Sequence, residues 1–266
     1  MYLRVLFISE GILIMIILKK ISKTAKKLLA YFSKGELLLW LFSVTLITVS
    51  FFVFGGNGAL TLIASLIGVT SILINAKGNP TGQLLMIAFS LLYGIISYSF
   101  SYYGEMITYL GMTMPMAVFA LISWLRHPHE GKRSEVRVNS VSGTEAYLML
   151  LAAAIVTGVF YFILRYFNTA NIIPSTVSVT TSFLAVYLTF RRDPHFGLAY
   201  AANDVVLIIL WTLASLADSR YISVTVCFAA FLINDIYGFV SWQKMKSKQE
   251  RDAKAKAKAE AEAKAA

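Results

Sequence analysis

The sequence predicts an all-α polytopic membrane protein with eight transmembrane helices, and three observations support this prediction. The chain of 266 residues is 58% hydrophobic with a mean hydropathy of +0.68, which exceeds the apolar share of ordinary soluble domains. Eight apolar segments of roughly 18 to 22 residues are each long enough to cross a hydrocarbon core of about 30 Å. Of the 24 Lys and Arg residues, all but Arg165 and Arg220 then fall on one side, as the positive-inside rule requires of cytoplasmic segments.

The eight predicted spans follow one another with short connections. They are Leu37–Phe54, Ala59–Ala76, Gly82–Tyr102, Met106–Leu125, Thr144–Leu164, Ile172–Phe190, Phe196–Ala217 and Tyr221–Trp242. Both terminal segments are rich in lysine, so we expect both termini in the cytoplasm. The net charge of +10 follows from this distribution and from attraction to anionic lipid, so it does not indicate nucleic acid as a partner.

Residues 1–36 are expected to be a cytoplasmic or interfacial amphipathic segment. The apolar stretch Val5–Leu18 contains Glu10 and is followed by several lysines. A secretory signal has the opposite order, with its charge before the apolar stretch. A stretch of about 14 residues is also short for a span, so we expect a helix that lies on the membrane. Residues 243–266 form a charged cytoplasmic tail without an apolar face, expected to be a solvated helix or a disordered arm.

Two similar blocks of three helices suggest an internal repeat. The blocks cover residues 59–125 and 172–242, and each has a turn with proline between its first two helices, at Pro80 and Pro194. They end similarly, in Ile-Ser-Trp124 and Val-Ser-Trp242. The single helix 144–164 between them returns the chain to its starting side, so the blocks insert in the same orientation. We therefore expect a 3+1+3 parallel repeat about an axis along the membrane normal, with 37–54 as an accessory helix.

Polar residues inside the spans are the candidates for a binding site, because a charge at mid-span is costly and usually faces the interior of the bundle. Asp204 lies about 12 Å along its helix from Phe196, near the middle of the membrane. Tyr200 and Trp211 share its face, and Asn203 borders it. Aromatic rings, an amide and a carboxylate suit a ligand with a flat cationic ring and a ribose. Helix–helix hydrogen bonding in a buried core is the structural alternative for each residue.

The other spans supply further candidates. In the last helix, Asn234 and Tyr237 share a face and Asp235 lies beside it, while Pro115 in the fourth span removes a backbone hydrogen bond. The predicted substrate-binding residues are Gln83, Ser90, Tyr93, Tyr200, Asn203, Asp204, Trp211, Asn234, Asp235 and Tyr237. Thr113 is a weaker candidate, and Gln83 is close enough to the turn that it could serve only as its cap.

Two stretches of the second block resemble the PnuC family of vitamin B3 transporters. They are RDPHFGLAYAANDVVLIILW at residues 192–211 and FLINDIYGFVSWQKM at residues 231–245. The resemblance covers roughly residues 59–245 and implies a SWEET-like fold, nicotinamide riboside as substrate and facilitated diffusion by alternating access. It also implies a homotrimer in the bacterial cytoplasmic membrane, with cytosolic phosphorylation by another enzyme trapping the substrate for NAD biosynthesis. Many family members have a Trp-rich start to the penultimate helix, where this chain has Phe196 and Tyr200.

Together the residues and the resemblance predict a passive carrier of nicotinamide riboside, with membrane lipid as its surroundings and no cofactor. Two alternatives remain at this point: a carrier of another vitamin or nucleoside, such as thiamine, riboflavin or a deoxynucleoside, and proton coupling through Asp204 and Asp235. An intramembrane enzyme is a third possibility, but no nucleophile or metal set accompanies the carboxylates. The chain has no phosphate-binding Gly-x-x-x-x-Gly-Lys-Ser/Thr loop, and His127, His129 and Glu130 are not a sufficient metal set. We therefore expect neither ATP-driven pumping nor catalysis.

Overall fold

A computed structural model describes residues 30–55, 58–99, 102–169 and 171–265 and divides the chain into two units, 1–42 and 43–266. The interfacial helix predicted at Val5–Leu18 lies outside the described residues. Helix α2 (Lys34–Val53) begins with a capping box, because the Glu36 N–H donates to Ser33 Oγ at 3.2 Å and the Ser33 N–H donates to Glu36 Oε2 at 2.6 Å. The first unit ends within this helix.

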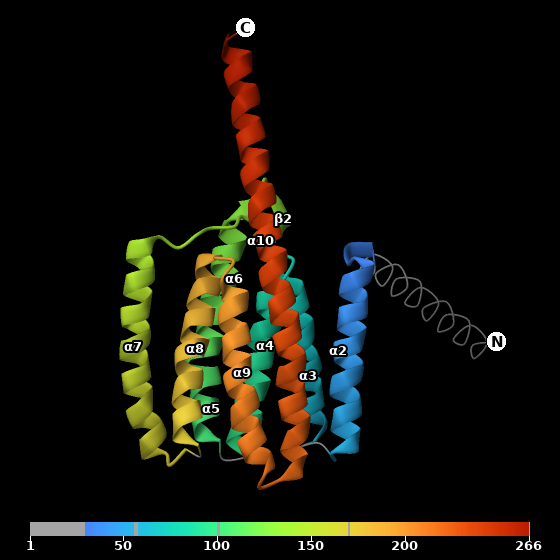
Figure 1. Ribbon diagram of the computed structural model, residues 1–266, viewed down its shortest axis with the longest axis vertical. Coiled ribbons are helices and arrows are strands. Elements are labelled where there is room, and N and C mark those ends of the chain that lie inside the picture. The colour runs from blue at the N-terminus through green and yellow to red at the C-terminus, as the bar shows by residue number, and fades with distance from the viewer. Residues whose placement is uncertain (1–29, 56–57, 100–101, 170, 266) are drawn as a thin grey trace, which may run out of the picture. The chain divides into compact units, whose positions relative to one another are not determined.

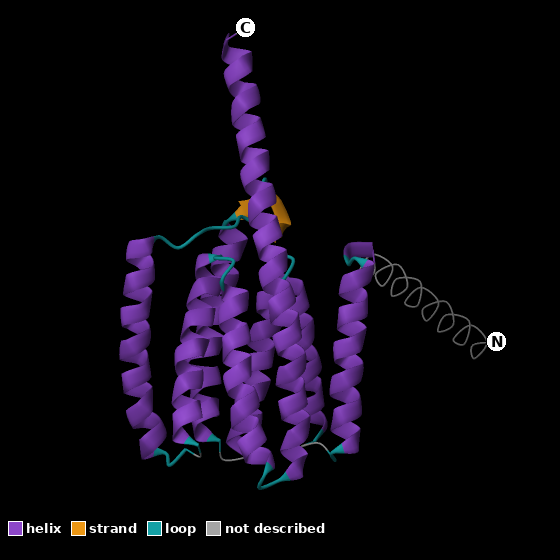
Figure 2. Cartoon of the chain, in the orientation of Figure 1, coloured by secondary structure: helices purple, strands orange, loops and turns teal. Residues whose placement is uncertain are grey.

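The second unit is helical apart from one short hairpin (Figures 1 and 2). Its helices are α3 (Ala59–Asn75), α4 (Thr81–Ser99), α5 (Tyr103–Thr108), the π-helix η1 (Tyr109–Thr113), α6 (Met114–Arg126), α7 (Gly143–Tyr166), α8 (Ile172–Arg191), α9 (Phe196–Ser215), the 3₁₀-helix η2 (Ser219–Tyr221) and α10 (Ile222–Ala265). The strands β1 (Pro128–His129) and β2 (Lys132–Val136) pair antiparallel. We call the side of the unit that carries this hairpin the hairpin end.

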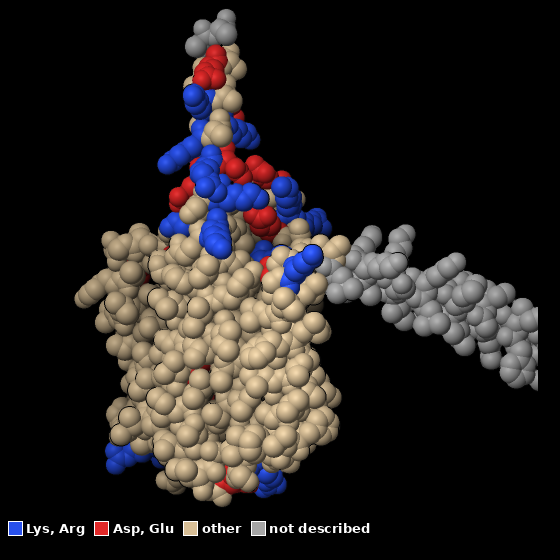
Figure 3. Space-filling model, turned by 45° about the vertical axis from the view of Figure 1, so that its right-hand side comes forward, with Lys and Arg blue, Asp and Glu red and all other residues tan. Residues whose placement is uncertain are grey.

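The helices have the length and surface of a multi-pass membrane protein. Among the described residues, seven helices are long and apolar enough to cross a membrane, and α3 adds a shorter apolar helix of 17 residues. The most apolar of them, α7, has only 11% of its 18-residue window buried, so the rest of the chain leaves most of its apolar side chains uncovered. Figure 3 shows Lys, Arg, Asp and Glu gathered around the hairpin end and α10, above a broad uncharged surface.

Six helices form a closed ring. Helix α4 packs between α3 and α6, α9 packs between α8 and α10, and the ring closes where α6 packs on α8 and α10 packs on α3. Helix α7 lies outside the ring against α8. The ring therefore consists of two sets of three helices, the first block (α3, α4, α5–α6) and the second block (α8, α9, α10), which meet along two seams.

The fourth predicted span, Met106–Leu125, differs from a single regular helix. It begins earlier, at Tyr103, and the π-helix Tyr109–Thr113 separates α5 from α6. Pro115 has no N–H to donate to the preceding turn, and the Met114 N–H bonds to the Tyr109 carbonyl five residues back. A π-helical turn contains one more residue than an α-helical turn, so the helix continues although Pro115 donates no hydrogen bond.

Two further differences concern the ends of the bundle. The last predicted span stops at Trp242, whereas α10 continues to Ala265, because its Lys, Glu and Ala residues are strong helix formers. The cytoplasmic loop expected between the fourth and fifth spans contains the β hairpin, which the sequence analysis did not predict. The hairpin is held to α10 by Gln249, whose side chain donates to the Val136 carbonyl and accepts from the Val138 N–H.

The turns after α3 and α8 have the same backbone hydrogen bonds. Gly78 and Arg192 both have positive φ, at 66° and 59°, and their N–H groups bond to Asn75 and Thr189, three residues back. The chain after the hairpin joins the two turns, since the Val136 N–H bonds to the Gly78 carbonyl and the Asn139 N–H bonds to the Arg192 carbonyl. Both turns therefore lie at the hairpin end.

Candidate functional site

A cavity lies inside the six-helix ring, and its wall comes from α3, α4, η1, α8, α9 and α10. Its volume is about 40 Å³, below the roughly 300–1,000 Å³ of small-molecule pockets, so the surrounding side chains must move apart to hold a ligand of that size. Its lining residues are Ile72, Asn75, Met86, Phe89, Tyr109, Thr113, Ser182, Phe196, Tyr200, Asn203, Asp204, Phe228, Phe231 and Asp235. Both seams between the blocks therefore open onto the same space.

The polar side of the cavity comes from α9 and α10. The carboxyl groups of Asp204 and Asp235 lie next to each other and are 3% and 4% exposed. Oxygen Oδ2 of Asp204 is buried and has no hydrogen-bond partner among the described residues. Gly197 allows the two helices to approach, because a Cβ there would lie 2.7 Å from the Phe239 backbone nitrogen. The site thus places two carboxyl groups together without a cationic residue in the described lining.

Asn203 is oriented by α8. Its Oδ1 accepts hydrogen bonds from Thr181 Oγ1 at 2.8 Å and from Ser182 Oγ at 3.0 Å. Both bonds use the oxygen, so the Nδ2 donor is available to a ligand in the cavity. The amide is thereby held in one orientation before any ligand binds.

Aromatic rings form much of the remaining wall. Phe89 is in edge-to-face contact with Tyr109 at 5.8 Å between ring centroids and with Phe231 at 5.7 Å. Phe228 contacts Phe231 at 5.6 Å. Such rings offer flat surfaces for stacking and attract cations through their faces. The cavity combines these faces with the carboxyl pair.

Of the residues predicted from sequence, Tyr200, Asn203, Asp204 and Asp235 line the cavity. Trp211 lies outside the lining and packs against Tyr102 at 5.0 Å and Tyr221 at 5.5 Å between ring centroids. Its indole Nε1–H is buried without a hydrogen-bond partner among the described residues. Its predicted role as the stacking partner stays a prediction, and the rings of the lining are better placed for it.

Tyr93 and Ser90 also lie behind the lining. The Tyr93 ring contacts that of Tyr109 at 4.5 Å, so the two form one aromatic layer on the side of the cavity away from the hairpin end. The hydroxyl groups of Tyr93 and Ser90 are buried without partners in the described part of the chain. Their part in binding stays a prediction.

The three remaining candidates take part in contacts between helices or lie outside the lining. Gln83 donates to Asn75 Oδ1 at 3.0 Å, next to the turn after α3. Asn234 donates to Ser43 Oγ at 2.7 Å and to the Ala230 carbonyl at 2.8 Å. Tyr237 is half-buried and does not line the cavity. These contacts favour the structural alternative that the sequence analysis left open.

Several lining residues were not predicted. Asn75 and Ser182 lie on helices that contain several other serines and threonines, so nothing marked them out. The hydrophobic Phe89 and Phe228 gave no signal that separates a cavity wall from a core. Tyr109 had a possible signal, since it lies six residues before Pro115 and π-helices are frequent at functional sites. Buried hydroxyl and amide groups facing one another could be found only from the packing.

Reciprocal bonds close the hairpin end of the cavity. The Trp124 Nε1–H donates to the Thr189 carbonyl at 2.9 Å, and the Trp242 Nε1–H donates to the Asn75 carbonyl at 2.8 Å. The preceding serines repeat the pattern, from Ser123 to the Phe190 carbonyl at 3.0 Å and from Ser241 to the Ala76 carbonyl at 2.7 Å. The last helix of each block therefore holds the end of the first helix of the other. We call this group the Ser–Trp contacts.

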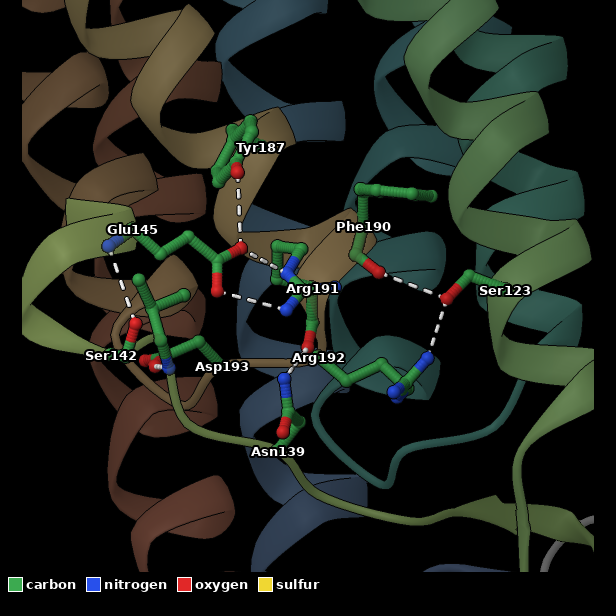
Figure 4. Close-up of polar contacts among 10 residues, drawn as sticks. Ser123, Asn139, Ser142, Glu145, Tyr187, Phe190, Arg191, Arg192 and Asp193 are labelled. Carbon is green, nitrogen blue, oxygen red and sulfur yellow. Dashed lines mark hydrogen bonds and ion pairs between the residues drawn. The ribbon is translucent and has the colours of Figure 1, made fainter. Parts of the chain in front are cut away.

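Figure 4 shows how α7 and the loop before it attach to the second block. Glu145 accepts from the Tyr187 hydroxyl at 3.0 Å and forms an ion pair with Arg191. Arg192 points the other way, with Nη1 2.6 Å from Ser123 Oγ. Adjacent arginines at the end of α8 thus bind the linker helix and the first block.

Comparison with known proteins agrees with this architecture. The crystal structure of the vitamin B3 transporter PnuC matches with a TM-score of 0.72 at 22% identity, covering 82% of this chain and 94% of that chain. The nicotinamide riboside transporter PnuC of Neisseria mucosa is 24% identical over 211 residues, which are 78% of this chain and 80% of the relative. The model of the nicotinamide mononucleotide transporter family matches residues 58–244. The chain belongs to this family of membrane transporters, as the resemblance in its second block predicted.

Proposed function

We propose that the protein carries nicotinamide riboside across the membrane and binds it in the cavity of the six-helix ring. The observation that carries this proposal is the lining itself, in which a carboxyl pair and an oriented amide face a set of aromatic rings. The pyridinium ring of the riboside is a flat cation, which rings and carboxylates both attract. Its ribose hydroxyls are donors for Asp204 Oδ2, and its polar oxygens are acceptors for Asn203 Nδ2.

The charge of the cavity favours the riboside over the mononucleotide named in the family description. A phosphate group adds negative charge, and phosphate sites in proteins supply arginine, lysine or a helix N-terminus with free N–H groups. The described lining contains two carboxyl groups and no Lys, Arg or His. Desolvating a phosphate beside Asp204 and Asp235 would be unfavourable without such a partner.

The proposed mechanism is alternating access by rocking of the two blocks, arranged as a SWEET-like 3+1+3 parallel repeat. The Ser–Trp contacts support the repeat, because equivalent residues of the two blocks make them. The accepting carbonyls are 114 residues apart in the two first helices, and the donating side chains are 118 residues apart in the two last helices. In this mechanism the Ser–Trp contacts break when the hairpin end opens. The aromatic layer of Tyr93 and Tyr109, which belongs to the first block, separates from Phe228 of the second block when the other end opens.

We propose facilitated diffusion, with proton coupling as the alternative that a specific observation favours. That observation is the adjacency of Asp204 and Asp235, since paired carboxyl groups in a span are a common proton site. Uptake into proteoliposomes distinguishes the two mechanisms. Facilitated diffusion predicts the same initial rate with and without an imposed pH gradient, and a gradient-driven accumulation would establish coupling.

The membrane context completes the proposal. We propose a homotrimer in a bacterial cytoplasmic membrane with both termini in the cytoplasm, surrounded by lipid. The distribution of Lys and Arg supports this orientation, because the hairpin and the C-terminal part of α10 carry most of the described cations (Figure 3). Cysteine labelling from each side of the membrane tests the orientation, and mass measurement in detergent tests the trimer.

Isothermal titration calorimetry of the purified protein tests the substrate. The expected result is binding of nicotinamide riboside, with nicotinamide mononucleotide, thiamine, riboflavin and thymidine at least about tenfold weaker, a difference of about 1.4 kcal/mol each. Tighter binding of the mononucleotide would reject the argument from cavity charge. Preference for another of these compounds would retain the carrier and change its substrate.

A further inference from the structure

The two seams between the blocks have equivalent positions in the fold but different chemistry. In the first seam α5, η1 and α6 face α8, and in the second α10 faces α3. Each seam runs from the cavity to the end of the bundle that lies away from the hairpin. Either seam could in principle admit a substrate from that side.

The first seam has a continuous polar lining. Glu105, Tyr109 and Thr113 are spaced four residues apart and therefore share one face of their span. The facing side chains on α8 are serines at spacings of three and four, and Ser178 contacts the Glu105 carboxyl group. We call this group the polar seam: Glu105, Tyr109, Thr113, Ser175, Ser178 and Ser182. Three of the six, Tyr109, Thr113 and Ser182, also line the cavity, so the polar seam leads directly into it.

Glu105 is a buried carboxyl group at the outer part of this seam. It is 3% exposed and lies about 6 Å along the helix from Tyr109. No Lys, Arg or His in the described part of the chain forms an ion pair with it. A charged group buried in a membrane protein is costly without a partner and is by default a candidate for function. A cation that passes through the seam would supply the missing partner.

The second seam offers no such path. At the places that correspond to Glu105, Tyr109 and Thr113 on the last helix of the block, α10 has Ser223, Cys227 and Phe231. The Ser223 hydroxyl donates to the carbonyl of Arg220, three residues earlier in the chain, at 2.8 Å. On α3, Gly68 faces the Phe231 ring, which fills the space that a Cβ there would need. Ser65 of α3 contacts the Cys227 thiol across this seam, but among the described residues the seam contains no carboxylate, and the packing of Phe231 on Gly68 closes it.

We infer that Glu105 and Ser178 form an outer binding station for the cationic substrate, which enters and leaves the cavity through the polar seam. This inference rests on the proposed function, since it concerns an organic cation that binds in the cavity. The substrate would contact Glu105 first and then pass Tyr109 to reach Asp204. Glu105 therefore acts on the rate of entry, and the affinity of the cavity depends on other residues.

The test compares Glu105→Gln, which removes the charge at nearly constant size, with Glu105→Asp, which keeps it. Calorimetry gives the affinity for nicotinamide riboside, and proteoliposomes give the initial uptake rate at low substrate concentration. We expect Glu105→Gln to lower the rate at least about tenfold, equivalent to about 1.4 kcal/mol, while the Kd changes by less than about twofold. Glu105→Asp should recover at least about a third of the lost rate, and Ser178→Ala should slow uptake more mildly. Glu130→Gln, the same change in the exposed hairpin, is the matched control.

Each outcome decides the inference. An unchanged rate for Glu105→Gln, or a rate and affinity lost in parallel, would overturn it. Equal rates for Glu105→Gln and Glu105→Asp would also overturn it, because the charge would then have no part. If Glu105→Gln does not fold, Ser178→Ala and Glu105→Asp decide by the same two measurements. A wild-type protein that neither binds nor takes up the riboside would instead reject the proposed function, and the inference with it.

Discussion

The first and second blocks share backbone hydrogen bonds at the hairpin end and differ in what they present to the cavity. Both blocks contribute rings and an amide, Asn75 from the first block and Asn203 from the second, but both carboxyl groups come from the second block. The two blocks thus share a backbone arrangement and differ in charge. From this difference we infer that the shared backbone serves the movement of the blocks, and that recognition of a cationic ligand needs carboxyl groups from only one block.

Removing the carboxylate of Asp204 should have the largest effect. We expect Asp204→Asn to weaken binding of nicotinamide riboside about 100-fold, because a buried charge contact with a cation is lost, about 2.7 kcal/mol. Asp235→Asn should cost about tenfold. Calorimetry measures both, with Asp252→Asn on the exposed part of α10 as the matched control. Equal, small effects at all three positions would show that the carboxyl groups of the second block do not bind the ligand.

A pair of asparagines separates binding from stability within the second block. Asn203→Ala should weaken binding about tenfold, since its Nδ2 is lost from the cavity, and it should also lower the free energy of unfolding by about 1 kcal/mol, since Ser182 Oγ loses its acceptor. Asn234→Ala should lower the free energy of unfolding by about 1–2 kcal/mol, because Ser43 Oγ loses its buried donor, with little change in Kd. Calorimetry and thermal unfolding in detergent provide the two measurements. The reverse pattern would move the site from Asn203 to Asn234.

Breaking the Ser–Trp contacts tests whether the two blocks hold each other equally. Trp124→Phe and Trp242→Phe each keep a large ring and remove one hydrogen bond to a buried carbonyl. We expect each variant to lose about 1 kcal/mol of stability. The double variant should lose less than the sum, because the two rings are in contact at 5.2 Å. A loss confined to one variant would contradict the reciprocal arrangement.

The smallest changes in stability are expected from substitutions at the two positive-φ positions, Gly78 and Arg192. Gly78→Ala should lower stability by about 1 kcal/mol, since a Cβ is unfavourable at φ 66°. Arg192→Gly relieves the same strain but loses the bond to Ser123, so its net effect should stay within about 0.5 kcal/mol. Thermal unfolding compares the two. A large loss for Arg192→Gly would show that this arginine does more than join the blocks.

Periodicity and charge predicted the helices well because both depend on local composition. A span needs about 20 apolar residues, and the described helices lie where such segments occur. The helix boundaries differ from the predicted ones where a particular residue changes the backbone hydrogen bonds. At Pro115, the missing N–H changes the hydrogen bonding of the preceding turn. The hairpin escaped prediction because β1 and β2 are short and contain no apolar alternation.

The candidate site was predicted only in part. Asp204, Asp235 and Asn203 stood out because polar groups are rare in apolar spans. Trp211 and Asn234 were predicted for the same site from their positions in apolar spans. In the structure, Trp211 packs among tyrosines and Asn234 bonds to Ser43. Sequence spacing identifies the face of a helix, but it does not say which neighbour covers that face.

The membrane class, the apolar helices and the resemblance to a transporter family could be read from the sequence, because they follow from composition and from short runs of residues. The closure of six helices into a ring, the difference between the two seams and the bonds from the last helix of each block to the first helix of the other became visible only in the folded chain. These features depend on contacts between residues more than 60 positions apart, such as Trp124 with Thr189 and Trp242 with Asn75. Their partners are chosen by packing, which no local pattern in the chain records.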